Sequence, residues 1–200
     1  MNSIGTIVSM RNARRRPAAR GFTLIELVVT VAVGAILTAI AVPAFDAFVK
    51  NDRDSAQINS IAYSLNYARS EAVKRDLATG VSVCPSADGL TCNGTAWAGG
   101  WMVFYIDPTT AAVTPLQTVP ALAGSNTVTA HGSATNGITF LSSGLATGLT
   151  APMAQPLQIN VCDTRGAAYA RDIEINVAGR VAASQNHGVA VDGVTPLVCP

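Results

Sequence analysis

Hydrophobic residues form one continuous run near the start of the chain and then a periodic pattern. Residues 22–45 read FTLIELVVTVAVGAILTAIAVPAF, with Glu26 as the one charged side chain. A helix needs about 20 apolar residues to span a bilayer, so this run is long enough to cross a membrane. Beyond it, apolar side chains recur at intervals of three and four, at Ile58, Ile61, Leu65, Ala68 and Ala72. The two patterns predict one long helix, with a membrane-spanning half at 22–45 and an amphipathic half at 46–77.

The remainder of the chain, residues 78–200, shows short β-type segments without helical periodicity between them. Strands are expected at 81–83, 101–107, 127–130, 137–141, 156–162, 171–177 and 188–192, separated by Gly, Pro, Asn and Ser. Consecutive strands without crossover helices favour an antiparallel sheet or two stacked sheets. The predicted fold class is therefore α+β, with the long N-terminal helix packed on a β-rich head.

Charge is scarce and unevenly distributed. Charged residues make up 12% of the 200 residues, about half the usual share, which excludes a disordered chain and a typical nucleic-acid-coating protein. Of the 13 basic residues, five arginines lie within the first 21 positions; the remaining 8 face 12 acidic residues, a formal charge of −4. Because positive flanks stay in the cytoplasm, the head is expected on the far side of the membrane.

A cleaved secretory signal peptide in front of a periplasmic enzyme or binding protein is the alternative explanation of this N-terminus. Small residues at 39–41 or 42–44 could serve signal peptidase. However, the apolar run exceeds the roughly 7–15 residues of a signal peptide. Glu26 also lies inside the run, where a carboxylate is costly and marks a functional site. Both features favour a retained helix.

The motif around Glu26 is recognisable. Residues 20–27 read RGFTLIEL, which resembles the prepilin peptidase motif of type IV pilins and type II secretion pseudopilins. The resemblance implies that residues 1–21 are a leader, cut by a prepilin peptidase between Gly21 and Phe22, and that Phe22 is then N-methylated. It also implies that Glu26 is the family's assembly acid. A buried carboxylate is tolerable if it meets the N-terminal amine of a neighbouring subunit.

Two further strings narrow the resemblance. Residues 67–75 read YARSEAVKR and residues 100–107 read GWMVFYID; both are similar to the GspH/FimT branch of the pilin superfamily. The branch implies a pilin-like fold and a structural subunit, a minor pilin or pseudopilin of a type IV pilus or a type II secretion pseudopilus. Its expected partners are other pilins or pseudopilins, met through the N-terminal helix. Its expected place is the bacterial inner membrane, single-pass with a periplasmic head, before it joins the filament.

The four cysteines, Cys84, Cys92, Cys162 and Cys199, all lie outside the membrane on this topology. An even number in an oxidising compartment indicates disulfides, and four cysteines allow three pairings. Pairing Cys84 with Cys92 and Cys162 with Cys199 is favoured over the other two. No metal or cofactor is expected, because no C-x-x-C spacing occurs and neither His131 nor His187 has ligand neighbours.

Catalytic motifs are not evident, so the chain is predicted not to be an enzyme. Ser142, His131 and Asp107 could be combined into a triad on paper, but no spacing supports it. Asp172 and Glu174 alternate along an expected strand, and the simpler interpretation is a solvated sheet face.

DNA binding is the alternative function, as in a minor pilin for DNA uptake in natural transformation. Residues 179–182 read GRVA, which resembles a Gly-Arg-x-Arg element that contacts DNA in some FimT-like minor pilins. Arg180 is retained, but Ala182 replaces the second arginine. Only three basic residues face six acidic ones between residues 77 and 200, and DNA affinity grows with the number of phosphates neutralised. A structural subunit is therefore favoured.

Overall fold

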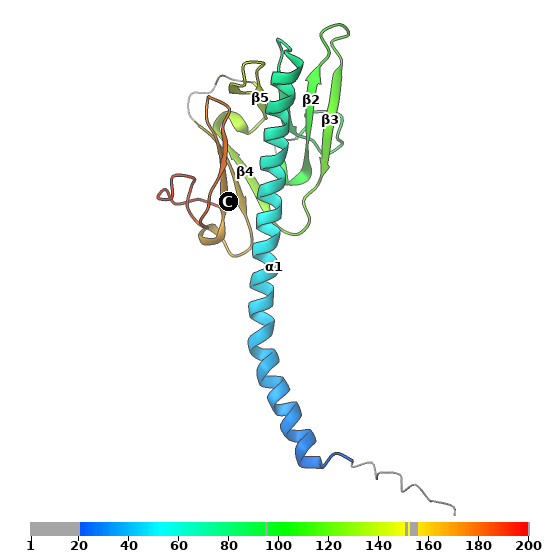
Figure 1. Ribbon diagram of the computed structural model, residues 1–200, viewed down its shortest axis with the longest axis vertical. Coiled ribbons are helices and arrows are strands. Elements are labelled where there is room, and N and C mark those ends of the chain that lie inside the picture. Colours follow the sequence, from blue (N-terminus) through cyan, green and yellow to red (C-terminus); the bar gives the residue numbers. More distant parts are fainter. Residues whose placement is uncertain (1–20, 95, 151, 153–155, 200) are drawn as a thin grey trace, which may run out of the picture. The chain divides into compact units, whose positions relative to one another are not determined.

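The computed structural model describes residues 21–94, 96–150, 152 and 156–199 (Figure 1). The chain divides into two compact units, Met1–Phe45 and Asp46–Pro200. A single helix, α1 (Leu24–Arg75), supplies the described helix of the first unit and the N-terminal part of the second. The predicted continuous helix is confirmed, and it ends two residues before the expected boundary at 77, with Asp76 at a positive φ of 49°.

In the first unit, α1 exposes its apolar side chains in every direction. Its most apolar 18-residue window has a mean hydropathy of 2.4, and none of that window is buried within the described structure. The hydroxyls of Thr30 and Thr38 donate to carbonyl oxygens of their own helix at 2.9 Å, so they need no water. Pro43 lies inside α1, which continues past it. This is a helix suited to lipid or to other helices.

The second unit contains nine described strands in two antiparallel sheets. One sheet has the order β3-β2-β1-β5-β6 and the other β4-β7-β8-β9. The first is built from β1 (Val81–Pro85), β2 (Gly100–Ile106), β3 (Val113–Pro120), β5 (Ile138–Phe140) and β6 (Ala146–Gly148). The second is built from β4 (Thr127–His131), β7 (Leu157–Cys162), β8 (Arg171–Ile175) and β9 (Val181–Ala183). The expected α+β class is confirmed, in its two-sheet form.

Several strand predictions were wrong. Strand β3, which carries two prolines, was not expected; among the described strands it pairs with β2 alone, and an edge strand tolerates missing N–H donors. Strands β6 and β9 were not expected either; each is three residues long and lies at an edge of its sheet. The strand expected at 188–192 is instead a turn-rich segment with one isolated bridge, Val189 to Pro196.

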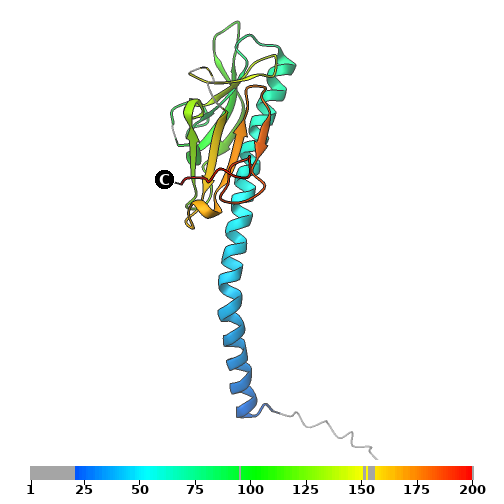
Figure 2. The ribbon, with the colours of Figure 1, turned by 90° about the vertical axis from the view of Figure 1, so that its left-hand side faces the viewer.

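The core of the second unit lies between the amphipathic face of α1 and the two sheets (Figure 2). The expected stripe is buried completely: Ile58, Ile61, Leu65, Ala68 and Ala72 are each at most 1% exposed. They join one cluster with side chains from both sheets, among them Val83, Trp101, Phe140, Ile159 and Ile173. Burial of each large apolar side chain stabilises the head by about 1.5–3 kcal/mol, which makes α1 an integral part of the head.

Candidate functional site

The expected processing site lies at the start of the described chain. Gly21 and Phe22 precede α1 outside regular secondary structure, and Phe22 is 82% exposed. A Cβ added to Gly21 would meet nothing within 4 Å among the described residues. Packing among the described residues therefore does not require glycine here. The expected leader itself lies outside the described residues.

Glu26 lies in the first turn of α1. The residue before the helix, Thr23, accepts a hydrogen bond from the Glu26 N–H through its Oγ1 at 3.3 Å. Thr and Glu three residues apart match the spacing of a capping box, a local signal that starts a helix. A carboxylate in the first turn also complements the helix dipole. The Glu26 side chain is exposed, so the same residue that helps start the helix remains accessible to another molecule.

A buried polar cluster joins α1 to the head, and we call it the polar clasp: Asp54, Gln57, Asn126, Asp163 and Arg165. The Asn126 amide donates to Asp54 Oδ1 at 2.6 Å and to Gln57 Oε1 at 2.7 Å. Arg165 donates through Nη2 to Asp54 Oδ2 at 3.1 Å and pairs through Nε with Asp163. The clasp thus connects the helix with two separate loops of the head.

Charge in the polar clasp is unbalanced, because one guanidinium faces two carboxylates. Burial raises the pKa of Asp54 above its ordinary value, and neighbouring Asp163 adds to the rise, against lowering by Asn126 and Arg165. A buried ion pair adds little net stability but penalises any arrangement that separates it. The clasp was not predicted from the sequence. The sequence did contain a signal for it, because Asp54 and Gln57 continue the buried stripe of α1 on the N-terminal side of Ile58.

Arg69 forms a second connection between α1 and the head. Its Nε donates to the carbonyl oxygen of Gly144 at 3.2 Å, and its Nη2 to that of Ala178 at 3.0 Å. Gly144 lies between β5 and β6 of one sheet, and Ala178 between β8 and β9 of the other. One guanidinium therefore fixes a turn from each sheet to the helix, which gives a physical role to the arginine of the YARSEAV string.

Arg180, the candidate DNA contact, lies in the turn between β8 and β9. Its backbone N–H donates to Asn176 Oδ1 at 3.0 Å, and its side chain is exposed beside a shallow hollow of about 390 Å³. The other two arginines of the head do not join it. Arg165 is held in the polar clasp, and Arg171 Nε lies 3.4 Å from His187 Nε2. Nothing in this arrangement specifically supports DNA binding.

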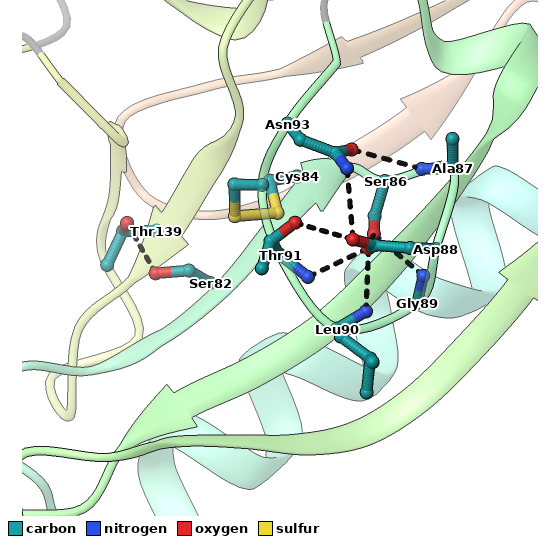
Figure 3. Close-up of a disulfide and its surroundings, with 11 residues drawn as sticks. Ser82, Cys84, Ser86, Ala87, Asp88, Gly89, Leu90, Thr91, Asn93 and Thr139 are labelled. Atoms are coloured by element: carbon teal, nitrogen blue, oxygen red, sulfur yellow. Dashed lines mark hydrogen bonds between the residues drawn. A yellow bond between two sulfur atoms is a disulfide. The ribbon is translucent and has the colours of Figure 1, made fainter.

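Two disulfides close the head: Cys84 with Cys92, eight residues apart, and Cys162 with Cys199, 37 residues apart. Within the shorter loop, Asp88 accepts hydrogen bonds from the backbone N–H groups of Leu90 and Thr91, both at 2.9 Å (Figure 3). These bonds hold the pKa of Asp88 well below its usual range. The longer disulfide ties the C-terminal segment to β7.

The remaining candidates are not brought together. Asp107 accepts hydrogen bonds from Thr109 and Thr110 within its own turn, and His131 contacts Asn160. Within the described residues, no three His, Cys, Asp or Glu side chains are grouped so that they could hold a metal ion.

The expectation of a solvated carboxylate face was wrong for Asp172. Its side chain is fully buried, whereas that of Glu174 is half-buried. The C-terminal segment lies against this part of β8, and the Val191 N–H donates to Asp172 Oδ2 at 3.3 Å. Burial raises the pKa of Asp172 to about 6.

Comparisons with known structures match this architecture to pilins. The type IV minor pilin FimU of Pseudomonas aeruginosa, in two crystal forms, gives TM-scores of 0.53 and 0.51 at 20% and 22% identity. These matches cover 73% and 70% of this chain and 99% and 98% of the FimU chains. At such identity the likeness concerns the fold: a helix packed on antiparallel sheets.

Comparisons of sequence lead to the same superfamily. The fimbrial protein EcpB of Eikenella corrodens is 41% identical over 76 residues, which is 37% of this chain and 45% of EcpB. Residues 16–42 match the family model of the prokaryotic N-terminal methylation motif. Residues 57–179 match the model described as type II transport protein GspH. That match spans more than half of the chain, from the stripe of α1 to the β8–β9 turn, and the chain therefore belongs to the GspH family of minor pilins and pseudopilins.

Proposed function

We propose that this chain is a non-enzymatic structural subunit of a type IV pilus or type II secretion pseudopilus. A prepilin peptidase cuts it between Gly21 and Phe22, and Phe22 becomes the methylated N-terminus. Residues 22–45 hold it in the inner membrane with the head in the periplasm. The same segment then leaves the lipid and packs against the helices of other subunits.

The observation that carries this proposal is the two-sided character of α1. Up to residue 45 its apolar side chains are exposed all round, and from Asp54 onward its stripe is buried in a GspH-type head. A soluble protein rarely exposes so large an apolar surface, which marks a membrane or assembly site. One uninterrupted helix therefore carries an exposed apolar segment, which needs lipid or other helices around it, and also forms part of a folded head, which does not.

In this proposal, Glu26 sets the register in which the subunits assemble. In the apolar core of a filament, its carboxylate is stabilised when it pairs with the N-terminal amine of a neighbouring subunit. An unpaired charge there is unfavourable, so subunits placed out of register are penalised. The accessible position of Glu26 in the first turn of α1 supports this role.

The polar clasp and Arg69 hold the head in a fixed position along its helix. A force that pulls on the helix reaches the head through α1 itself, and Asp54, Gln57 and Arg69 resist sliding of the helix along the sheets. Apolar contacts alone are non-directional, whereas these hydrogen bonds require one register. The head therefore stays aligned with its helix while the filament assembles.

The test is the substitution Glu26→Gln, which keeps size and hydrogen-bonding capacity but removes the charge. We expect the variant to enter the membrane and be cleaved normally, yet to be depleted at least tenfold from sheared filaments, the equivalent of about 1.4 kcal/mol. The matched control is Asp46→Asn, at an exposed carboxylate paired with Lys50 at 2.8 Å. It should assemble like the parent. Normal incorporation of Glu26→Gln would overturn the role of the charge.

A further inference from the structure

Two buried acceptor atoms lie opposite each other on neighbouring strands of the second sheet. Asn160 on β7 and Asp172 on β8 are register partners, so their side chains leave the same face of the sheet with Cβ atoms about 5 Å apart. Asn160 is 4% exposed and Asp172 is fully buried. In each residue the Oδ1 atom is buried and has no hydrogen-bond partner among the described residues.

The other polar atoms of the pair are occupied. Asp172 Oδ2 accepts from the Val191 N–H at 3.3 Å, and Asn160 Nδ2 lies 3.2 Å from His131 Nε2. An unpaired buried acceptor destabilises the folded state, and two of them side by side destabilise it more. One hydrogen on Asp172 Oδ1, donated to Asn160 Oδ1, would satisfy both atoms.

We propose that Asp172 and Asn160 share a buried proton, which is carried by the Asp172 carboxyl and donated to the amide oxygen of Asn160. The proton comes from solvent and returns to solvent when it is lost. Without it, Asp172 is a buried carboxylate facing an amide oxygen, and the ionised group becomes hydrated only if its cover moves. That cover is the C-terminal segment, which packs through Ala190, Leu197 and Cys199. The pair is therefore a pH-sensitive latch for this segment.

The surrounding charges favour the protonated form. Glu174 on the same strand and Asp192 in the C-terminal segment both raise the pKa of Asp172, in addition to burial. From β4, the titratable group His131 contacts Asn160 rather than Asp172. Ser184, which follows β9, is uncharged and accepts from the Asp172 N–H at 3.0 Å. The neighbouring cation Arg171 is directed to His187.

The direction of the pH effect follows from the raised pKa. The folded head binds one more proton than the unfolded chain between the ordinary pKa of 3.8 and the raised value of about 6. The stabilisation that the Asp172 carboxyl contributes is complete below pH 3.8 and is lost as the pH rises through about 6. The C-terminal segment should therefore be held more firmly as the pH falls from about 6 towards 4.

The test compares the mature full chain with its Asp172→Asn variant, both in detergent micelles with disulfides intact. Denaturant unfolding is followed by tryptophan fluorescence, which reports on the head because the two tryptophans, Trp97 and Trp101, are buried there. Relative to the variant, the unfolding equilibrium constant of the parent should rise about tenfold per pH unit from pH 4 to 6, about a hundredfold in all, and then level off. Asp46→Asn, at an exposed carboxylate on α1 away from this pair, is the control and should keep this slope.

A carbon-13 titration of the Asp172 carboxyl, assigned with the same variant, gives the second measurement. A midpoint near 6, with lower amide-exchange protection factors at residues 188–199 above it, is the expected result. A midpoint near 3.8 with no pH-dependent difference between parent and variant would overturn the latch. That result would mean that the Asn160 side-chain amide is flipped, so that its NH₂ group donates to Asp172 Oδ1 and its oxygen accepts from His131.

Discussion

Gly179 lies so close to Gly144 that a Cβ built on Gly179 would be 2.0 Å from the Gly144 carbonyl oxygen. The same oxygen accepts the hydrogen bond from Arg69 Nε. Gly179 belongs to the β8–β9 turn of one sheet and Gly144 to the β5–β6 turn of the other. The glycine of the Gly-Arg element is therefore explained by the packing of two turns against α1, without reference to DNA.

Replacing Gly179 with alanine should destabilise the head by about 2–5 kcal/mol, since it adds a steric clash to the cost of a left-handed conformation. Gly193→Ala is the matched control, because Gly193 has a similar φ of +75° but nothing within 4 Å of its added Cβ. It should cost only about 1–2 kcal/mol. Denaturant unfolding monitored by tryptophan fluorescence gives both values, and equal costs would show that the turn contact is unimportant.

Replacing Gly21 with valine should leave the precursor uncut, because a branched side chain crowds the peptidase at the residue before the scissile bond. A Cβ added at this position meets nothing within 4 Å among the described residues, so we expect the defect to lie in processing. Gly34→Ala, at a helix position with equally open surroundings, should be cut normally. Intact mass measures both, with a methyl group added to the cleaved form. A mature chain that begins beyond Ala41 would contradict the proposed leader.

Thiol titration of the unreduced, denatured chain should find no reactive thiol. Removing Cys162 and Cys199 together should cost about 4 kcal/mol, and removing Cys84 and Cys92 about 2.5 kcal/mol, because a longer closed loop restricts the unfolded chain more. The loops span 37 and 8 residues, respectively. Unfolding of the two double alanine variants tests this order, and a reversed order would contradict the loop-entropy explanation.

Duplex DNA should bind weakly or not at all, since only three basic residues face six acidic ones between residues 77 and 200. Non-specific affinities of cationic proteins lie at about 10⁻⁴–10⁻⁶ M at physiological salt, and we expect this protein at or beyond the weak end. A gel-shift series across salt concentrations should show a gain for Ala182→Arg, which restores the missing charge. Tight binding by the parent that is lost in Arg180→Ala would instead favour DNA uptake.

The helix was predictable because its determinants are local. The apolar run at 22–45 and the stripe from Ile58 to Ala72 are periodic in the sequence itself, and the motif around Glu26 is contiguous. Strands β1, β2, β4, β5, β7 and β8 were also anticipated, from runs of β-type residues bounded by Gly, Pro, Asn and Ser. The strands that were missed, β3, β6 and β9, all lie at an edge of their sheet, where pairing with a single neighbour decides their place.

The sequence by itself therefore determined the class of fold, the long helix and the segments around Gly21 and Glu26, all of which depend on neighbours along the chain. Only the tertiary structure decided which polar residues are buried. Asp54 meets Arg165 across 111 positions, and Asp172 becomes inaccessible because the C-terminal segment packs on it. The physical reason is that desolvation and hydrogen bonding depend on distance in space, so their effect on a carboxylate appears only when remote segments meet.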